Sequence, residues 1–222
     1  MQQQDTLLNT SNTRALEVNK VLRNTYMLLS MTLAFSAVMA GISMAIAPPR
    51  MTGLICTGLA FLLIMFVIPK TANSEKGILS VFALTGLLGF GLGPMLNAYL
   101  QLSNGPALIM QALGGTAVVF LGLSAYALTT KKDFSFLGGF LMIGMIVVLV
   151  AAIANIFFAV PAISLAISSA VIFIMSGFIL FDTSRIINGG ETNYIMATVS
   201  LYLSIYNIFV NLLVILGVMG DD

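Results

Sequence analysis

The sequence predicts an all-α membrane protein with seven transmembrane helices. Only 8% of its 222 residues are charged, 59% are hydrophobic, and the mean hydropathy is +1.05. Soluble domains carry about 25% charged residues, so this chain lacks the polar surface that a soluble fold needs. Long stretches without any charge alternate with short charged segments, and each stretch is long enough to cross a bilayer once or twice.

The first two charge-free stretches provide one helix each. Residues 24–49 comprise 26 uncharged residues and residues 51–69 comprise 19, and about 20 residues cross the ~30 Å hydrocarbon core. A secretory signal peptide ending at residues 45–47 is the alternative interpretation of the first stretch. The polar segment before it and the length of its apolar run disfavour that alternative.

The next two charge-free stretches are too long for a single helix. Residues 77–130 comprise 54 uncharged residues and residues 134–181 comprise 48, so each stretch is expected to turn once. The sequence Ser-Asn-Gly-Pro at 103–106 predicts the first turn, and Pro161 predicts the second. Residues 192–220 supply the seventh helix.

The lysines and arginines predict the orientation, because they concentrate in the cytoplasmic segments of membrane proteins. With seven spans, one side of the membrane receives all of them except Arg50. The N-terminus is therefore expected in the cytoplasm and the C-terminus outside. The residues on the cytoplasmic side are Arg14, Lys20, Arg23, Lys70, Lys76, Lys131, Lys132 and Arg185.

Residues 1–22 are expected to form a polar cytoplasmic tail, and residues 23–220 the transmembrane domain. The tail is rich in Gln, Asn and Thr and lacks a clear helical stripe. Two interpretations stay open for it. One is a frayed terminus, which most proteins have; the other is a flexible handle for a cytoplasmic partner.

The residue types that usually carry catalysis are scarce. The chain has no histidine and a single cysteine, Cys56, within an apolar run. Serine and cysteine triads therefore lack their usual base, and zinc or copper sites lack their usual ligands. We predict no enzymatic activity and no cofactor, and the net charge of +1 gives no reason to expect nucleic acid as a partner.

Glycines cluster in the predicted third helix. Gly89 and Gly93 form a small-xxx-small pair, which lets helix backbones approach closely in a bilayer. Pro94 removes one hydrogen bond of the helix and permits a kink. Tight packing and a gating kink are the two interpretations of this segment. The glycines are Gly86, Gly89, Gly91 and Gly93.

Few polar side chains lie inside the predicted spans. An unpaired amide in lipid is costly, so each of them is expected to face the bundle. In the last helix, the spacing of the polar residues places them on one face as a polar seam. The seam consists of Ser200, Ser204, Asn207 and Asn211, and the remaining polar residues are Asn97, Gln111 and Asn155.

Asp182 and Arg185 are the remaining ionisable pair, and both lie on the predicted sixth helix, which is expected to stop near residues 188–190. Their i, i+3 spacing allows them to pair. An acid inside a membrane span is a candidate functional residue by default. The alternative is a side chain that only reaches back to the interface.

Two segments resemble the Bax inhibitor-1 family. They are FDTSRIINGGETNYIMATVSLYLSIYNIFVNLLVILG, from residue 181 onward, and TGLLGFGLGPMLNAYL in the third helix. The segments VLRNTYMLLSMTLAFSAV, SAYALTTKKDFSFLGG and NGGETNYI look closer to one bacterial branch, the YccA proteins. The resemblance implies six helices around a central seventh, in a multi-pass protein of the bacterial inner membrane.

The resemblance also implies two candidate activities. Family members are described as leak channels sensitive to calcium or protons, gated by two aspartates in the sixth and seventh helices. The YccA branch is associated instead with the membrane-anchored AAA protease FtsH, as its substrate and modulator. The polar N-terminal tail is similar to the segment by which that protease engages the protein.

The chain departs from the channel pattern at one position. Asp182 matches the first aspartate, but the motif LYLDxxNLF of many members reads LYLSIYNIF here, so Ser204 stands where the second aspartate would be. Two close carboxylates share a proton, whereas one carboxylate and a hydroxyl do not. We therefore place modulation of FtsH by binding ahead of permeation by Ca²⁺ or H⁺.

Overall fold

The computed structural model describes the backbone of residues 2–220 and the side chains of residues 16–220. Every regular element within the described residues is helical. Seven of the helical segments there are long and apolar enough to cross a membrane, which confirms the predicted fold class and the predicted number of spans. They are Leu16–Ile46, Met51–Thr71, Lys76–Leu100, Gly105–Thr130, Leu137–Phe158, Pro161–Ile187 and Tyr194–Met219.

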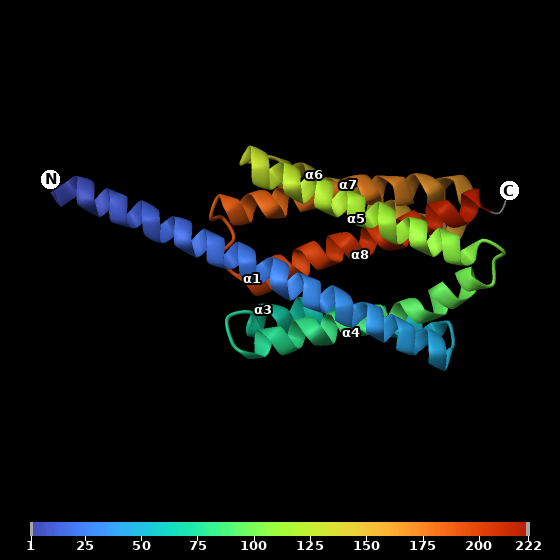
Figure 1. Ribbon diagram of the computed structural model, residues 1–222. Helices are drawn as coiled ribbons and strands as arrows, with labels where there is room; N and C mark the ends of the chain where they lie inside the picture. The colour runs from blue at the N-terminus through green and yellow to red at the C-terminus, as the bar shows by residue number, and fades with distance from the viewer. Residues whose placement is uncertain (1, 221–222) are drawn as a thin grey trace.

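Helix α1 is much longer than the sequence predicted. It begins at Gln2 and ends at Ile46, so residues 2–22, which were expected as a polar cytoplasmic tail, are helical and continuous with the first transmembrane helix. These 45 residues contain no proline and one glycine, Gly41, so no residue type breaks the backbone ladder. The N-terminal part of α1 projects beyond the ends of the other helices (Figure 1).

The second span is composed of three segments. Helix α2 (Met51–Leu62) passes into a π-helical turn, η1 (Leu63–Val67), and then into α3 (Ile68–Thr71). Pro69 explains the change, because it has no N–H and its ring crowds the preceding turn. The widened turn lets the Ile68 N–H bond the Leu63 carbonyl.

Both turns predicted inside the long uncharged stretches are present. Helix α4 (Lys76–Leu100) is followed by α5 (Gly105–Thr130), and α6 (Leu137–Phe158) by α7 (Pro161–Ile187). Pro161 is the first residue of α7, a position where the missing N–H costs nothing.

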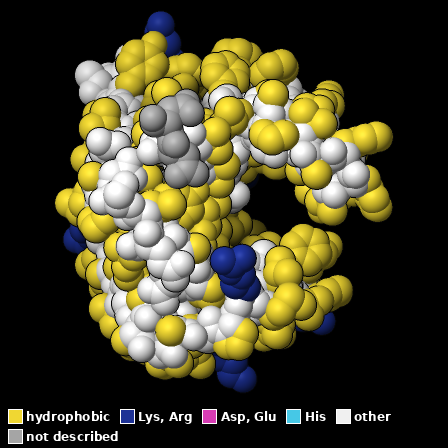
Figure 2. Space-filling model, turned by 90° about the vertical axis from the view of Figure 1, so that its right-hand side faces the viewer, with side chains coloured by type: hydrophobic (Ala, Val, Ile, Leu, Met, Phe, Trp, Pro, Cys, Tyr) yellow, Lys and Arg dark blue, Asp and Glu magenta, His cyan; other side chains and the backbone are white. Residues whose placement is uncertain are grey.

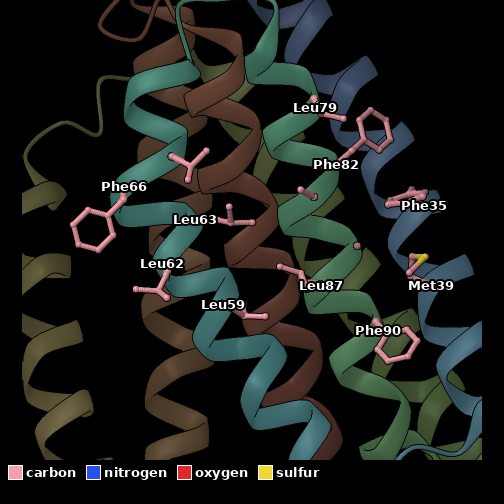
Figure 3. A pocket seen from close by; sticks show the side chains of 13 residues that line it. Phe35, Met39, Leu59, Leu62, Leu63, Phe66, Leu79, Phe82, Leu87 and Phe90 are labelled. Atoms are coloured by element: carbon pink, nitrogen blue, oxygen red, sulfur yellow. The ribbon is translucent and has the colours of Figure 1, made fainter.

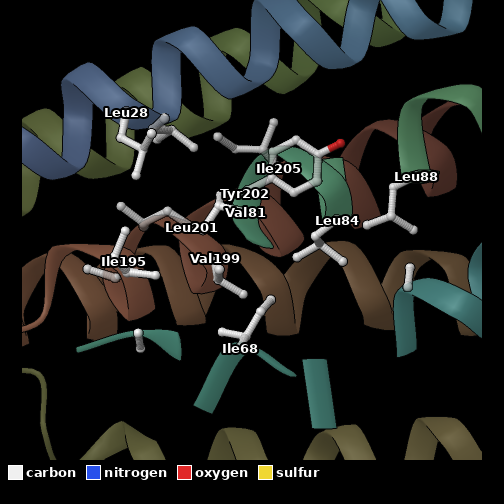
Figure 4. Close-up of a cluster of buried hydrophobic side chains, with 14 of the residues drawn as sticks. Leu28, Ile68, Val81, Leu84, Leu88, Ile195, Val199, Leu201, Tyr202 and Ile205 are labelled. Atoms are coloured by element: carbon white, nitrogen blue, oxygen red, sulfur yellow. The ribbon is translucent and has the colours of Figure 1, made fainter. Parts of the chain in front are cut away.

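The last helix, α8 (Tyr194–Met219), packs against four other spans, as α4 also does. It contacts α1, α4, α5 and α7, whereas α2 packs mainly on α4 and α6 mainly on α7. Leu201, Ile208 and Leu213 of α8 are fully buried. The largest apolar cluster joins α1, α3, α4 and α8 (Figure 4), and it includes Leu28, Ile68, Leu84, Leu201 and Tyr202.

Apolar side chains also cover the outside of the bundle. Helix α6 exposes Phe140, Ile146, Ile153 and Phe157, as expected for a helix that faces hydrocarbon. The view along the helices shows apolar side chains around most of the rim and a hollow on one side of the molecule (Figure 2).

Candidate functional site

The candidate site is the end of α7 that carries Asp182 and Arg185. Asp182 is buried, with 7% of its surface exposed. The Ser200 hydroxyl of α8 donates a hydrogen bond to Asp182 Oδ2 at 2.5 Å. A buried carboxyl without a partner is costly, so this hydrogen bond offsets part of that cost and joins α7 to α8.

Arg185 forms its ion pair with Glu191 and not with Asp182. Its guanidinium lies 3.4 Å from Glu191 Oε2 and over the ring of Phe181, 5.5 Å from the ring centroid. The chain reverses direction after α7 at Gly189, which has a φ of 73° that favours glycine. This reversal brings Glu191 back to Arg185 and explains why the predicted i, i+3 pair does not form.

The two residues between them bind other parts of the chain. The Thr183 hydroxyl lies 3.5 Å from the Tyr26 hydroxyl of α1. The Ser184 hydroxyl donates to the Lys132 carbonyl at 3.0 Å and accepts from the Phe134 N–H at 2.9 Å. Ser184 therefore holds the connection between α5 and α6 against α7.

That connection contains one carboxyl with a shifted pKa. The Ser135 hydroxyl and its backbone N–H, which donates to Asp133 Oδ1 at 2.8 Å, hold the pKa of Asp133 below its usual range. Asp133 is exposed and therefore stays ionised near neutral pH.

The connection between α7 and α8 is tied to a further loop. Asn193 caps α8 by accepting from the Ile195 and Met196 N–H groups. Its amide nitrogen donates to the Ala72 carbonyl at 3.0 Å and to Asn73 Oδ1 at 2.7 Å. Residues 181–193 thus bring together α1, α8 and two other connections at the end of the bundle from which α1 projects.

The first residue of the polar seam of α8, Ser200, contacts α7 through Asp182. Ser204 is buried and lies one turn farther from the helix start than Ser200, whose partner Asp182 is on α7. Asn207 and Asn211 each donate to the carbonyl four residues earlier in α8, at 2.8 Å. Each amide thus places one hydrogen bond within its own helix.

The glycine pair of α4 lies against α1. A Cβ atom added at Gly89 would overlap the carbonyl oxygen of Ser36, and one added at Gly93 would overlap the Ser43 side chain. Helix α4 continues past Pro94 to Leu100. These positions therefore allow a very close approach between two helices.

Three other amides were expected to face the bundle. The Asn97 amide donates to the Met44 carbonyl of α1 at 3.0 Å, and the Asn155 amide donates to the Ser164 hydroxyl at 2.7 Å. Gln111 contradicts the expectation, because it is exposed. It lies less than two turns from the start of α5 at Gly105, where a long side chain reaches the polar interface of the membrane.

Apolar surface dominates the hollows of the transmembrane part. An open groove of about 850 Å³ lies between α1, the second span and α4, and side chains such as Phe35, Phe66, Phe82 and Phe90 line it (Figure 3). Its lining offers no ionisable group. In residues 16–220, no group of three or more His, Cys, Asp or Glu is placed to hold a metal ion.

The sequence did not assign roles to several residues of this site. Ser200 was assigned to the seam but not to Asp182, and Ser184, Glu191 and Asn193 were not singled out. Ser184 lies within the FDTSRI motif that was quoted for the family resemblance, and this was the available signal. In the structure, each of the four central residues of that motif makes a side-chain contact.

We expect Ser184→Ala to loosen the connection between α5 and α6 without unfolding the bundle. The substitution removes the acceptor of the Phe134 N–H, so hydrogen–deuterium exchange at Phe134 should become severalfold faster. Ser176→Ala is the matched control, because the Ser176 hydroxyl bonds the Ile172 carbonyl of its own helix. Equal exchange in both variants would contradict the role of Ser184.

Comparisons with known proteins agree with the resemblance seen in the sequence. The family model described as "Inhibitor of apoptosis-promoting Bax1" (Bax1-I) matches residues 18–221. A protein of Escherichia coli strain K12 named "Modulator of FtsH protease YccA" is 56% identical over 220 residues, which cover 98% of this chain and 100% of that protein. A membrane protein of Vibrio cholerae is 54% identical over 209 residues, 94% of each chain. A Pseudomonas aeruginosa protein is 48% identical over the full length of both chains.

Proposed function

We propose that this chain, which belongs to the Bax1-I family, modulates a membrane-anchored AAA protease of the FtsH type by binding to it. The observation that carries the proposal is the 56% identity, over nearly the whole of both chains, to a protein named modulator of FtsH protease. A second relative with the same identity is named inner membrane protein YccA. We accordingly place the chain in the bacterial inner membrane.

The proposal includes an orientation and an arrangement of the helices. The split of the lysines and arginines favours the N-terminus in the cytoplasm and the C-terminus outside. The contacts of α8 with α1, α4, α5 and α7 support a central seventh helix, although α4 contacts as many spans and α2 and α6 lie mainly against α4 and α7. In this orientation the projecting part of α1 and the contacts of residues 181–193 share the cytoplasmic side.

The projecting part of α1 is the segment that we assign to the protease. It extends beyond the other helices (Figure 1), so the cytoplasmic part of the protease can bind it without any change in the bundle. This chain is then itself a substrate as well as a modulator. Binding rather than catalysis fits a chain without histidine.

Permeation by Ca²⁺ or H⁺ receives less support. It would rest on Asp182, whose hydrogen-bond partner is the hydroxyl of Ser200, and on a seam in which Ser204 replaces the second aspartate of the channel pattern. A pair of carboxylates that share a proton is not formed by these residues.

Deleting residues 2–10 is the test. In proteoliposomes with purified FtsH and ATP, we expect the full chain to be degraded and to slow the degradation of a second membrane substrate. The deletion should slow its own degradation severalfold, because the segment that enters the protease is shortened. A chain that lacks only Asp221 and Asp222 is the matched control.

Equal half-lives of the three proteins would contradict the assignment of the N-terminal segment. A second substrate that is degraded at the same rate with and without the full chain would contradict modulation itself.

A further inference from the structure

Helix α1 connects the proposed protease-binding segment directly to the bundle. Because it is one continuous helix from Gln2 to Ile46, a pull on its projecting end is transmitted along the axis to the part that packs in the membrane. At ~1.5 Å per residue, the part from Thr25 to Met44 extends over ~28 Å. Whatever holds this part of α1 must yield before the rest of the chain can be unfolded from the N-terminus.

The contact between α1 and α4 is unusually close. Serine side chains or carbonyls of α1 occupy the space that a Cβ would take at Gly89 and Gly93, and the Phe35 ring lies 2.8 Å from the Cβ position at Gly86. Ser36 and Ser43 are two turns apart on α1, so they repeat the same contact along the interface. Sliding α1 by a single residue would move both serines out of the spaces that the glycines leave.

Hydrogen bonds fix the same helix at both ends and in the middle. The Asn97 amide of α4 donates to the Met44 carbonyl at 3.0 Å. The Ser36 and Tyr202 hydroxyls lie 2.6 Å apart, and the Thr198 hydroxyl donates to the Thr25 carbonyl at 3.3 Å. The last two bonds connect α1 to α8.

These contacts have the geometry that resists shear. They are spread along α1 and would all be loaded when the helix is pulled along its axis. They also lie in the membrane, where a separated hydroxyl or carbonyl finds no water to replace its partner.

We infer that the α1–α4 interface, with the two hydrogen bonds from α1 to α8, is a mechanical lock against extraction from the N-terminus. The inference rests on the proposed function and says how that function is regulated, namely by the strength of the contacts that hold α1. A protease that pulls on α1 is held for as long as the lock resists, and during that time it degrades other substrates more slowly. The strength of the lock then decides how much this chain acts as a modulator and how much as an ordinary substrate.

Single-molecule force spectroscopy of the full chain in a bilayer tests the lock without any protease. The chain is pulled by a tag at its N-terminus, and the first force peak reports the extraction of α1. We expect Gly89→Ala to make this extraction about tenfold faster at a given force, because its Cβ forces α4 away from the Ser36 carbonyl. Gly122→Ala in α5 is the matched control, because a Cβ there meets no atom within 4 Å.

A second variant covers the case in which Gly89→Ala does not fold. Asn97→Ala removes the hydrogen bond to the Met44 carbonyl and leaves the glycines in place, so it should lower the same peak by a smaller amount. Extraction of α1 at the wild-type force in both variants would overturn the lock.

Degradation by FtsH separates the two proposals. If both hold, Gly89→Ala and Asn97→Ala are degraded faster than the wild type and slow the second substrate less. Weaker force peaks in the variants, together with a wild-type chain that leaves the degradation of the second substrate unchanged, would uphold the lock and overturn the proposed function. Weaker force peaks in variants that are degraded at the wild-type rate would overturn the regulatory role of the lock. Protease modulation by the wild type together with unchanged force peaks would uphold the function and overturn the lock.

Discussion

Asp182→Ala is expected to destabilise the bundle by about 1–3 kcal/mol, because it removes the carboxyl group that accepts the hydrogen bond of the half-buried Ser200 hydroxyl. Asp182→Asn should lower the stability of the bundle much less, since the amide oxygen still accepts the hydrogen bond from Ser200. The measurement is thermal unfolding of the purified protein in detergent. The buried thiol of Cys56, the single cysteine, reports unfolding when it becomes accessible to a thiol-reactive dye.

A double-mutant cycle isolates the contact itself. Combining Asp182→Ala with Ser200→Ala should give a coupling free energy of about 1–3 kcal/mol, because the two residues bond each other across α7 and α8. Combining Asp182→Ala with Ser176→Ala should be additive, because Ser176 bonds the Ile172 carbonyl of α7. A coupling below about 0.5 kcal/mol in the first cycle would show that the Asp182–Ser200 hydrogen bond contributes nothing net to stability.

The membrane spans could be read from the sequence because their physical cause is local. A charge inside hydrocarbon is costly wherever it occurs, so the uncharged stretches alone mark the spans. The turn at 103–106 and the start of α7 at Pro161 follow equally local rules for glycine and proline. None of these predictions required knowing which helices are neighbours.

The length of α1 could not be predicted in this way. An amphipathic stripe arises where one side of a helix is buried, whereas residues 2–22 extend a helix whose N-terminal part projects beyond the bundle. The absence of a stripe therefore did not exclude a helix. The sequence feature that favours a long helix is the lack of any proline or glycine before Gly41.

The partners within the candidate site depend on how the helices are placed relative to each other. Asp182 was identified because an acid in an apolar run is rare, but its partner is Ser200 and not Ser204, one turn away. Arg185 pairs with Glu191 because of the reversal at Gly189. Contacts of this kind follow from helix packing and loop geometry, which the spacing of residues in the sequence does not predict.

Gly105→Ala is expected to be the most destabilising single-methyl change in the connection between α4 and α5. Gly105 is buried at the start of α5, and its N–H donates to the Leu102 carbonyl at 3.1 Å. A Cβ atom there would overlap the Tyr99 carbonyl oxygen and lie 2.8 Å from the Tyr99 carbonyl carbon. These are backbone atoms, so no rotamer change relieves the overlap and the turn itself has to open.

Overpacking lowers the free energy of unfolding by about 1–3 kcal/mol, and we expect Gly105→Ala to fall at the upper end of that range. The midpoint of thermal unfolding should drop by about 5–10 °C. Gly114→Ala in the same helix is the matched control, because a Cβ at Gly114 meets no atom within 4 Å. Alanine is also the better helix former there by about 0.5–1 kcal/mol, so that variant should unfold at the same temperature or slightly higher. Midpoints that move together in the two variants would mean that the close approach at Tyr99 does not limit the stability of the bundle.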